Sequence, residues 1–174
     1  MLTLVKVFDL HYNTPMAWAQ KVAKLLIEKK KSLCLAESCT GGLLTHQLTN
    51  IPGSSQFLKL TIVAYSNESK VKLLKVPKEL IKKCGAVSEE TAVAMAQGAR
   101  NIVKTDFGLA ITGMAGPNGG TQTKPIGLCF VAISSKNEIL CVKYQLKGNR
   151  LQIKSQAVDK ALKLLIEFSR NGKN

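Results

Sequence analysis

A short segment, AESCTGG at residues 36–42, places a carboxylate, two hydroxyls and a thiol beside two glycines. It follows an apolar run that ends at Leu35 and precedes a helix-like segment that begins near Leu43. A strand, a tight turn and a helix start in this order can expose Ser38 as a nucleophile beside free backbone N–H groups. Ser38 or Thr40 can equally well cap the helix. The local sequence leaves both interpretations open.

A serine nucleophile needs a base, and the sequence contains two histidines, His11 and His46. His11 lies in an N-terminal arm, and His46 suits a partly exposed helix position, so a Ser–His–Asp triad is not favoured. Lysine can act instead when burial or neighbouring cations lower its pKa from about 10.4. Lys70 is the candidate because it follows a predicted strand end, although periodicity alone does not separate it from Lys72 and Lys75.

Other polar groups have a chemical and a structural interpretation. Cys39 is the rival nucleophile, yet a free cysteine is most often buried filler. The segment TGMAGPNGG at 112–120 offers backbone N–H groups to an anion, or it is an irregular surface loop. It lacks the lysine of a P-loop, and the chain lacks a G-x-G-x-x-G motif. Glu37 can orient a substrate hydroxyl or stabilise the turn, and Arg150 can bind an anion or lie exposed.

Alternating strand and helix patterns must position these groups. Apolar runs predict strands at 32–36, 60–65, 107–112, 126–134 and 138–146, the last two forming an antiparallel hairpin. Helical spacing predicts helices that start at Thr14–Pro15, near 42, at Asn67 as a cap, at 77, after Ser88 as a cap, and at 150. The predicted fold class is α/β, a three-layer α/β/α sandwich with a mixed, mostly parallel sheet and a C-terminal β-hairpin followed by a helix.

Ligands of open α/β sheets bind at the carboxyl ends of the strands. Three loops, 37–42, 65–70 and 112–120, follow predicted strands and are expected to converge there. The inner face of the last helix is predicted to comprise Ile153, Ala157, Ala161, Leu164, Leu165 and Phe168.

The composition suits one globular domain, expected to span residues 1–174 with a core at about 15–168. The N-terminal segment lacks a long apolar run and a cleavage site, so neither a signal peptide nor a membrane span is expected. Five cysteines without metal-ligand spacing suit reduced thiols. We therefore expect a cytoplasmic protein without a metal or cofactor. Our expectation for its partners is a small-molecule nucleotide substrate and further copies of the same chain in a homo-oligomer.

The net charge of +14 raises the question of a nucleic-acid partner. Only three of the 25 basic residues are arginines, and aromatic residues make up 5% of the chain. Base recognition favours arginine and stacking aromatics, whereas scattered lysines usually form solvated helix faces. A small anionic substrate explains part of the charge equally well. We expect no specific nucleic-acid partner, but non-specific binding at low salt.

Six segments occur in a fixed order: AESCTGG (36–42), PGSS (52–55), AYSNESK (64–70), GAVSEET (85–91), TGMAGPNGG (112–120) and KPIG (124–127). Over about residues 15–168 the chain resembles the C-terminal domain of the CinA (competence/damage-inducible) family of nicotinamide-nucleotide amidases. The resemblance implies hydrolysis of the carboxamide of nicotinamide mononucleotide to nicotinate mononucleotide and ammonia. Larger members of the family carry an additional N-terminal domain. The sequence shows no counterpart of it, so we expect the stand-alone form.

The resemblance assigns roles to individual positions. It implies that Ser38 is the nucleophile, that Lys70 is its base and that Tyr65 lines the catalytic site. Oxyanion or positioning contacts are expected from Glu37, Thr40, Gly41 and Gly42. Substrate contacts are expected from Thr112, Gly113, Ala115, Gly116 and Arg150.

Two departures from the family pattern lie next to Arg150. Asn149 replaces the aspartate of the family's GDR segment, and Lys154 stands where arginine is usual, which weakens the expected clamp on a substrate phosphate. They leave open a nucleotide-binding domain without turnover. The net charge of +14 and the family's association with competence leave open a second alternative, a competence- or DNA-associated accessory protein.

Overall fold

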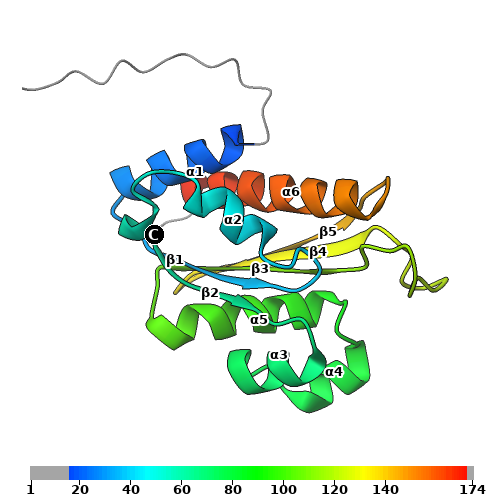
Figure 1. Cartoon of the computed structure of the whole chain (residues 1–174). Coiled ribbons are helices and arrows are strands. Elements are labelled where there is room, and N and C mark those ends of the chain that lie inside the picture. The colour runs from blue at the N-terminus through cyan, green and yellow to red at the C-terminus, as the bar shows by residue number, and fades with distance from the viewer. Residues whose placement is uncertain (1–15, 172–174) are drawn as a thin grey trace, which may run out of the picture.

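A computed structural model describes residues 16–171, which fold into three layers (Figure 1). The strands are β1 (Leu33–Glu37), β2 (Leu58–Val63), β3 (Phe107–Gly113), β4 (Leu128–Ser134) and β5 (Ile139–Gln145). The α-helices are α1 (Ala17–Glu28), α2 (Leu43–Thr49), α3 (Asn67–Leu74), α4 (Lys78–Cys84), α5 (Glu89–Val103) and α6 (Arg150–Asn171). The predicted helix start at Thr14–Pro15 lies outside the described residues, as does His11.

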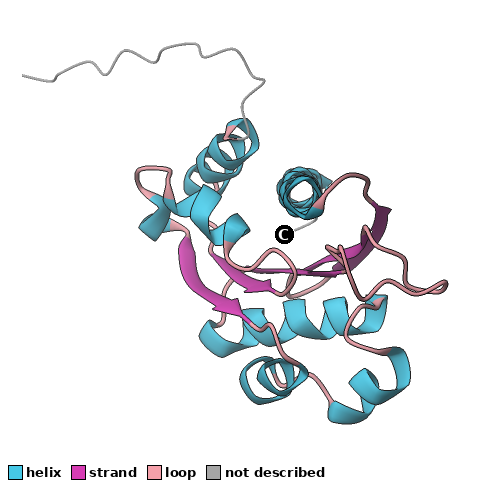
Figure 2. Cartoon of the chain, turned by 45° about the vertical axis from the view of Figure 1, so that its right-hand side comes forward, coloured by secondary structure: helices cyan, strands magenta, loops and turns pink. Residues whose placement is uncertain are grey.

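The five strands form one sheet in the order β2-β1-β3-β4-β5. β1 is parallel to β2 and β3, whereas β4 is antiparallel to β3 and β5. Helices α1, α2 and α6 cover one face, and α3, α4 and α5 cover the other (Figures 1 and 2). This arrangement confirms the predicted three-layer α/β sandwich, including the C-terminal hairpin, β4 and β5, and the helix that follows it.

The central strands are buried on both faces, which explains why they are continuous apolar runs in the sequence. One core contains Leu33, Leu35 and Leu109 and packs against α1, α2 and α6. The other contains Ala36 and Ala110 and packs against α5. All six residues predicted for the inner face of α6 are buried.

Three local predictions were wrong at the ends of elements. β2 begins and ends two residues earlier than the predicted 60–65, so Tyr65 lies in the loop after the strand. β4 begins at Leu128 instead of 126, because Gly127 has a φ of 88° and forms a turn in which its N–H donates to Met114. The cap of α3 is Ser66, whose hydroxyl accepts from the Ser69 N–H, and not Asn67.

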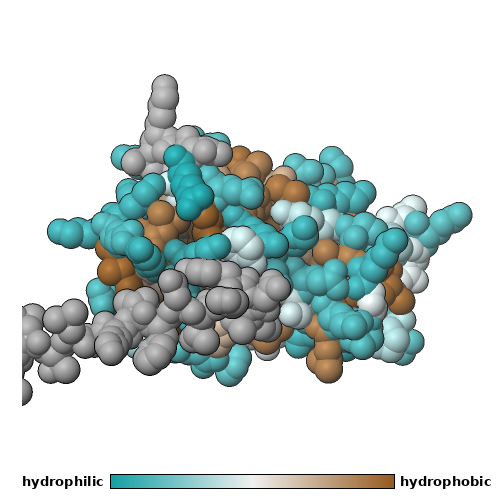
Figure 3. Space-filling view, turned by 90° about the horizontal axis from the view of Figure 1, so that it is seen from above, coloured by the Kyte–Doolittle hydropathy of each residue, from teal (hydrophilic) through white to brown (hydrophobic). Residues whose placement is uncertain are grey.

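Other features of the helices agree with the sequence. Ser88 caps α5 by accepting from the N–H of Thr91, as predicted. On the face formed by α1, α2 and α6, hydrophilic side chains cover much of the surface, with separate apolar areas between them (Figure 3). Among the described helices, none is long and apolar enough to cross a membrane.

Candidate active site

Ser38 and Lys70 lie in direct contact at the carboxyl edge of the sheet. The Lys70 Nζ lies 3.0 Å from the Ser38 Oγ, although 32 residues separate the two in sequence. Ser38 follows the last residue of β1, and its N–H donates to the Ile111 carbonyl of β3, which fixes the backbone of the turn. Lys70 comes from α3, which begins after β2. The parallel strands therefore deliver the two side chains to one point.

Backbone carbonyls hold the amine of Lys70 in place. Its Nζ is 2.8 Å from the carbonyl oxygen of Ala64 and 3.2 Å from that of Tyr65. The side chain is 1% exposed, and this burial lowers the pKa of Lys70, an effect that Cys39 and Glu68 only partly oppose. The other two lysines that periodicity left open, at 72 and 75, are exposed. Burial thus distinguishes Lys70 from its neighbours.

Glu37 caps the helix that follows the serine. Its carboxylate accepts from the N–H groups of Gly42, Leu44 and Thr45 at 3.0, 3.2 and 2.8 Å, and from the Thr45 hydroxyl at 2.7 Å. The residue is completely buried. A carboxylate beside a helix N-terminus is stabilised by these donors and by the helix dipole. Glu37 therefore holds the turn, which is the structural alternative considered for it, and its oxygens do not face a ligand.

The two glycines shape the turn and keep their own N–H groups occupied. Gly41 and Gly42 have φ values of 60° and 92°, a region that favours glycine. The Gly41 N–H donates to the Ser38 carbonyl, and that of Gly42 donates to Glu37. The oxyanion contacts expected from these two N–H groups are therefore not open in this structure.

Unused hydrogen-bonding groups lie just before the glycines. Among the described residues, the N–H of Thr40 has no acceptor and its buried Oγ has no partner, whereas the Cys39 N–H interacts with the Cys39 thiol. A buried hydroxyl without a partner is rare in a folded protein and calls for an explanation. The chemistry available in this turn is thus donation to an oxygen placed beside Ser38.

Arg150 connects the rim of the site. One guanidinium nitrogen donates to the Gly116 carbonyl at 2.6 Å, and the other donates to the Tyr65 hydroxyl at 3.0 Å. These bonds tie the start of α6 to the loops that follow β2 and β3. Tyr65 is 61% exposed, and its hydroxyl points to Arg150 rather than to Ser38. Lys154, one turn further along α6, places its Nζ 3.6 Å from where a side chain on Gly41 would begin.

Of the remaining predicted positions, Thr112 and Ala115 are buried and Gly113 is partly buried. The Thr112 hydroxyl donates to the Ala86 carbonyl at 2.8 Å, on the α5 side of β3. A side chain at Gly113 would collide with the carbonyl oxygen of Leu128. Ala115 belongs to the core on the α6 side. The register pairs Ala36 with Ala110 and Glu37 with Ile111, so Thr112 comes level with Ser38 on the α5 side of the sheet, whereas Ala115 lies on the α6 side.

Cys39 faces the core on the side of the sheet away from α5. A hydrogen bond with the Cys129 thiol lowers the pKa of Cys39, while burial opposes ionisation. The Lys70 amine contacts the hydroxyl of Ser38 and not this thiol. His46 is exposed on α2, where its ring contacts the Asn50 side chain. The lysine amine therefore contacts Ser38 and not the rival nucleophile Cys39, and the ring of His46 contacts Asn50 and not Ser38.

Sequence reasoning missed two features of this site. The carbonyls of Ala64 and Tyr65 that hold Lys70 are backbone groups, so no residue type signals them. The unused N–H of Thr40 is of the same kind. Lys154 was named from the family pattern, and its approach to the turn follows from its place four residues after Arg150 on the same helix face. Within the described part of the chain, no three His, Cys, Asp or Glu side chains form a potential metal site.

The fold and this geometry define an α/β domain with a serine–lysine pair at the carboxyl edge of a mixed sheet. Comparison with known proteins names its family. Residues 16–169 match the family model of the CinA C-terminal domain, and the chain belongs to this family.

Relatives and solved structures agree with this assignment. A CinA-like protein of Syntrophus aciditrophicus is 49% identical over 148 residues, which cover 84% of this chain and 35% of that protein. The chain thus spans about a third of the length of the curated relatives that it matches. The competence/damage inducible protein of Agrobacterium tumefaciens has a TM-score of 0.86 at 34% identity, covering 91% of this chain and 98% of that one. A CinA superfamily protein of Klebsiella pneumoniae has a TM-score of 0.89 at 30% identity, covering 92% and 100%.

Proposed function

We propose that this domain hydrolyses the carboxamide of nicotinamide mononucleotide, with Ser38 as nucleophile and Lys70 as its base. The observation that carries the proposal is the 3.0 Å contact between the Ser38 hydroxyl and a lysine amine that is 1% exposed. A structural lysine on a helix surface keeps its amine in water, whereas this one is desolvated beside a hydroxyl. Membership of the CinA family supports the same chemistry through the resemblance described above.

The partners of Lys70 suit a neutral amine. A neutral amine has two N–H groups and one lone pair, and the three atoms within 3.2 Å are two carbonyl oxygens and one hydroxyl. The carbonyls of Ala64 and Tyr65 can only accept, so they take the two N–H groups. The lone pair is then left pointing at the Ser38 hydroxyl, which donates its proton. Burial favours this neutral form because it lowers the pKa of Lys70.

The reaction follows from this arrangement. Ser38 Oγ attacks the carboxamide carbon, and its proton moves to Lys70. The oxygen of the tetrahedral intermediate takes hydrogen bonds from the Thr40 N–H and the Thr40 hydroxyl. Lys70 then protonates the amide nitrogen, the carbon–nitrogen bond breaks, and ammonia leaves an ester on Ser38. Water attacks the ester, gives a proton to Lys70, and Ser38 recovers its proton as the carboxylic acid departs.

The rim carries the charge needed for the nucleotide phosphate. Arg150 and Lys154 lie on one face of α6, and the carboxylate nearest the turn, Glu37, is already occupied by N–H groups. Two guanidinium nitrogens of Arg150 donate to Gly116 and Tyr65, and these hydrogen bonds shape the rim. Lys154 has no hydrogen bond or ion pair among the described residues, so its ammonium is available to a phosphate.

Asn149 preserves the local structure despite its departure from the family pattern. Its side-chain oxygen accepts from the Gln152 N–H at 3.0 Å, and its own N–H donates to the Gln152 side chain at 2.9 Å. This reciprocal pair is a capping box at the start of α6. Asparagine and aspartate are about equally good helix caps. The loss of the acid therefore keeps Arg150 at the first position of a capped helix.

The test is ammonia release from nicotinamide mononucleotide, measured for the wild type, for Ser38→Ala and for Lys72→Met as a control on the same helix as Lys70. We expect turnover by the wild type and the control, and a loss of at least about a thousandfold for Ser38→Ala. Equal rates for wild type and Ser38→Ala would refute the mechanism. Tight nucleotide binding without ammonia would instead support a binding domain that has lost turnover.

A further inference from the structure

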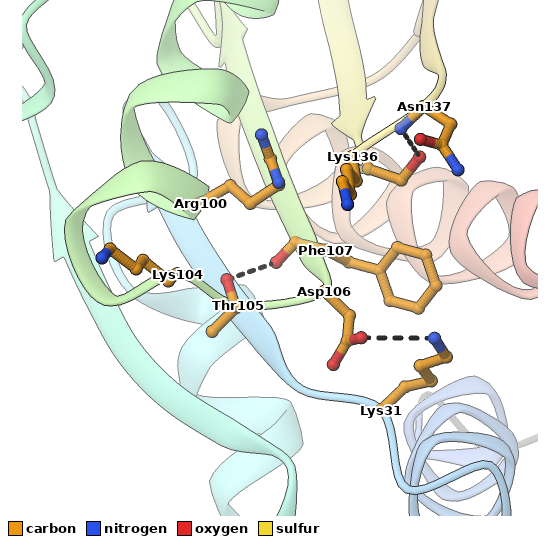
Figure 4. Close-up of a pocket in the computed structure, with 9 residues that line it drawn as sticks. Lys31, Arg100, Lys104, Thr105, Asp106, Phe107, Lys136 and Asn137 are labelled. Atoms are coloured by element: carbon orange, nitrogen blue, oxygen red, sulfur yellow. Dashed lines mark hydrogen bonds and ion pairs between the residues drawn. The ribbon is translucent and has the colours of Figure 1, made fainter. Parts of the chain in front are cut away.

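We propose that a small phosphate-bearing anion of the pyrophosphate class binds in a second pocket, at the opposite end of the sheet from Ser38. The pocket has a volume of about 320 Å³ and lies between the end of α5, the start of β3 and the turn from β4 to β5 (Figure 4). Its residues play no part in the proposed amidase reaction.

The two sites are separated by the length of the strands. Lys31 and Asp106, which line the pocket, precede the amino ends of β1 and β3. Ser38 follows the carboxyl end of β1. At about 3.3 Å per residue, the six steps from Ser32 to Ser38 cover roughly 20 Å. A ligand small enough for this pocket therefore does not reach the Ser38–Lys70 pair.

The pocket carries an excess of positive charge. Four of its lining side chains are basic, Lys31, Arg100, Lys104 and Lys136, and one is acidic, Asp106. The Asp106 carboxylate pairs with Lys31 at 3.2 Å and also accepts from the N–H and the hydroxyl of Ser32 at 2.8 and 2.7 Å. One carboxylate, already in a local network, leaves three cations unneutralised.

Those cations have no anionic partner within the described part of the chain. Arg100 donates from one terminal nitrogen to the neutral side chain of Asn101 at 3.2 Å, and its Nε is buried without a partner. Lys136 has neither a hydrogen bond nor an ion pair among residues 16–171. Figure 4 shows Arg100 and Lys136 approaching from α5 and from the β4–β5 turn. A buried guanidinium N–H without an acceptor is costly, and an anion between these two side chains would supply one.

Size and lining limit the ligand to a small phosphate. Ligand pockets usually range from about 300 to 1,000 Å³, so this one is at the lower end. The aromatic residue that lines it, Phe107, is 2% exposed and packs edge-on against Phe168, so it offers no face to a base. Stacking aromatics are the usual means of holding nucleobases. The pocket offers arginine and lysine side chains but no surface for stacking. This lining favours a ligand that is recognised through its phosphate oxygens and not through a base.

The experiment is isothermal titration calorimetry of the full chain with sodium pyrophosphate. The ionic strength is about 0.15 M, at which interactions between exposed charges are largely screened. The test variant is Arg100→Gln combined with Lys136→Gln. The control, Lys83→Gln combined with Lys143→Gln, removes the same charge from exposed positions outside the pocket. Ser38→Ala and Lys154→Gln are titrated as well, and thermal unfolding of each variant checks that it is folded.

We expect one pyrophosphate per chain, at least about tenfold weaker binding by the test variant, and less than about a twofold change in the control and in the two active-site variants. Four results would overturn the proposal. They are no binding by the wild type, equal weakening by the control, weakening only by Lys154→Gln, and binding of a DNA duplex but not of pyrophosphate through Arg100 and Lys136.

Discussion

Replacing Lys70 by arginine tests whether the amine must lose its proton. Arginine supplies N–H donors and a fixed positive charge, but its guanidinium stays protonated and so cannot act as a base. Lys70 is buried at 1% exposure, and burial lowers its pKa, so lysine can give and take a proton where arginine cannot. If Lys70 served only as a cation near the substrate, arginine would be an adequate replacement.

The expected loss can be estimated from the role of the base. General base catalysis contributes typically about 10² to 10⁴ in rate, and each factor of ten corresponds to about 1.36 kcal/mol. Loss of the base therefore raises the barrier by about 3–5 kcal/mol. The substitution leaves Arg150 and Lys154, the proposed phosphate-binding groups, unchanged, so KM for nicotinamide mononucleotide should change by less than about threefold while kcat falls.

The assay is steady-state ammonia release by Lys70→Arg, Lys70→Met and the exposed control Lys72→Arg. Lys70→Met fits the buried site without a charge, so it shows the effect of losing the amine even where the longer arginine disturbs α3. We expect both Lys70 variants to lose at least about a hundredfold in kcat, and the control to keep it. A folded Lys70→Arg with more than a third of the wild-type kcat would show that no base is needed at this position.

Three further predictions concern pH and stability. Because the pKa of Lys70 is lowered from its ordinary value of 10.5, the unfolded chain binds more protons between the two values. The free energy of unfolding of the wild type relative to Lys70→Met should therefore rise with pH through that window and level off above about 10.5. Chemical denaturation in which this difference falls with pH would contradict the lowered pKa. Glu37→Ala leaves four donors at the start of α2 without an acceptor and should cost at least about 2 kcal/mol in urea unfolding, so a loss below about 0.5 kcal/mol would contradict the capping role. Asn149→Ala should cost about 1 kcal/mol and Asn149→Asp almost nothing, and equal losses in thermal unfolding would contradict the capping box.

The sheet could be predicted from the sequence because its central strands are buried on both faces. β1, β3 and β4 are unbroken apolar runs, and their ends were predicted within about two residues. The edge strand β2 is only half-buried, so its pattern gave a weaker boundary and was placed two residues late. The cap of α3 was misplaced because Ser66 and Asn67 are both good caps, and only the backbone conformation decides between them.

The candidate site was predictable to the level of its side chains and no further. Ser38 and Lys70 were singled out by strand ends and by family resemblance, whereas their contact depends on carbonyls at Ala64 and Tyr65 that carry no sequence signal. The role of Glu37 as a cap requires the turn to bring α2 back onto the strand end, which spacing alone does not define. The basic pocket draws residues from four separate segments between Lys31 and Asn137, so no local motif could have indicated it.

The most direct test of the account is the mass of the covalent intermediate. The wild-type protein is mixed with nicotinamide mononucleotide, quenched with acid and digested, and its peptides are analysed by mass spectrometry. We predict an ester of the nucleotide's acyl group on the peptide that contains Ser38, at the Ser38 hydroxyl, and its absence from Ser38→Ala. An adduct on Cys39, or ammonia release by Ser38→Ala at the wild-type rate, would contradict the central claim that Ser38 is the nucleophile.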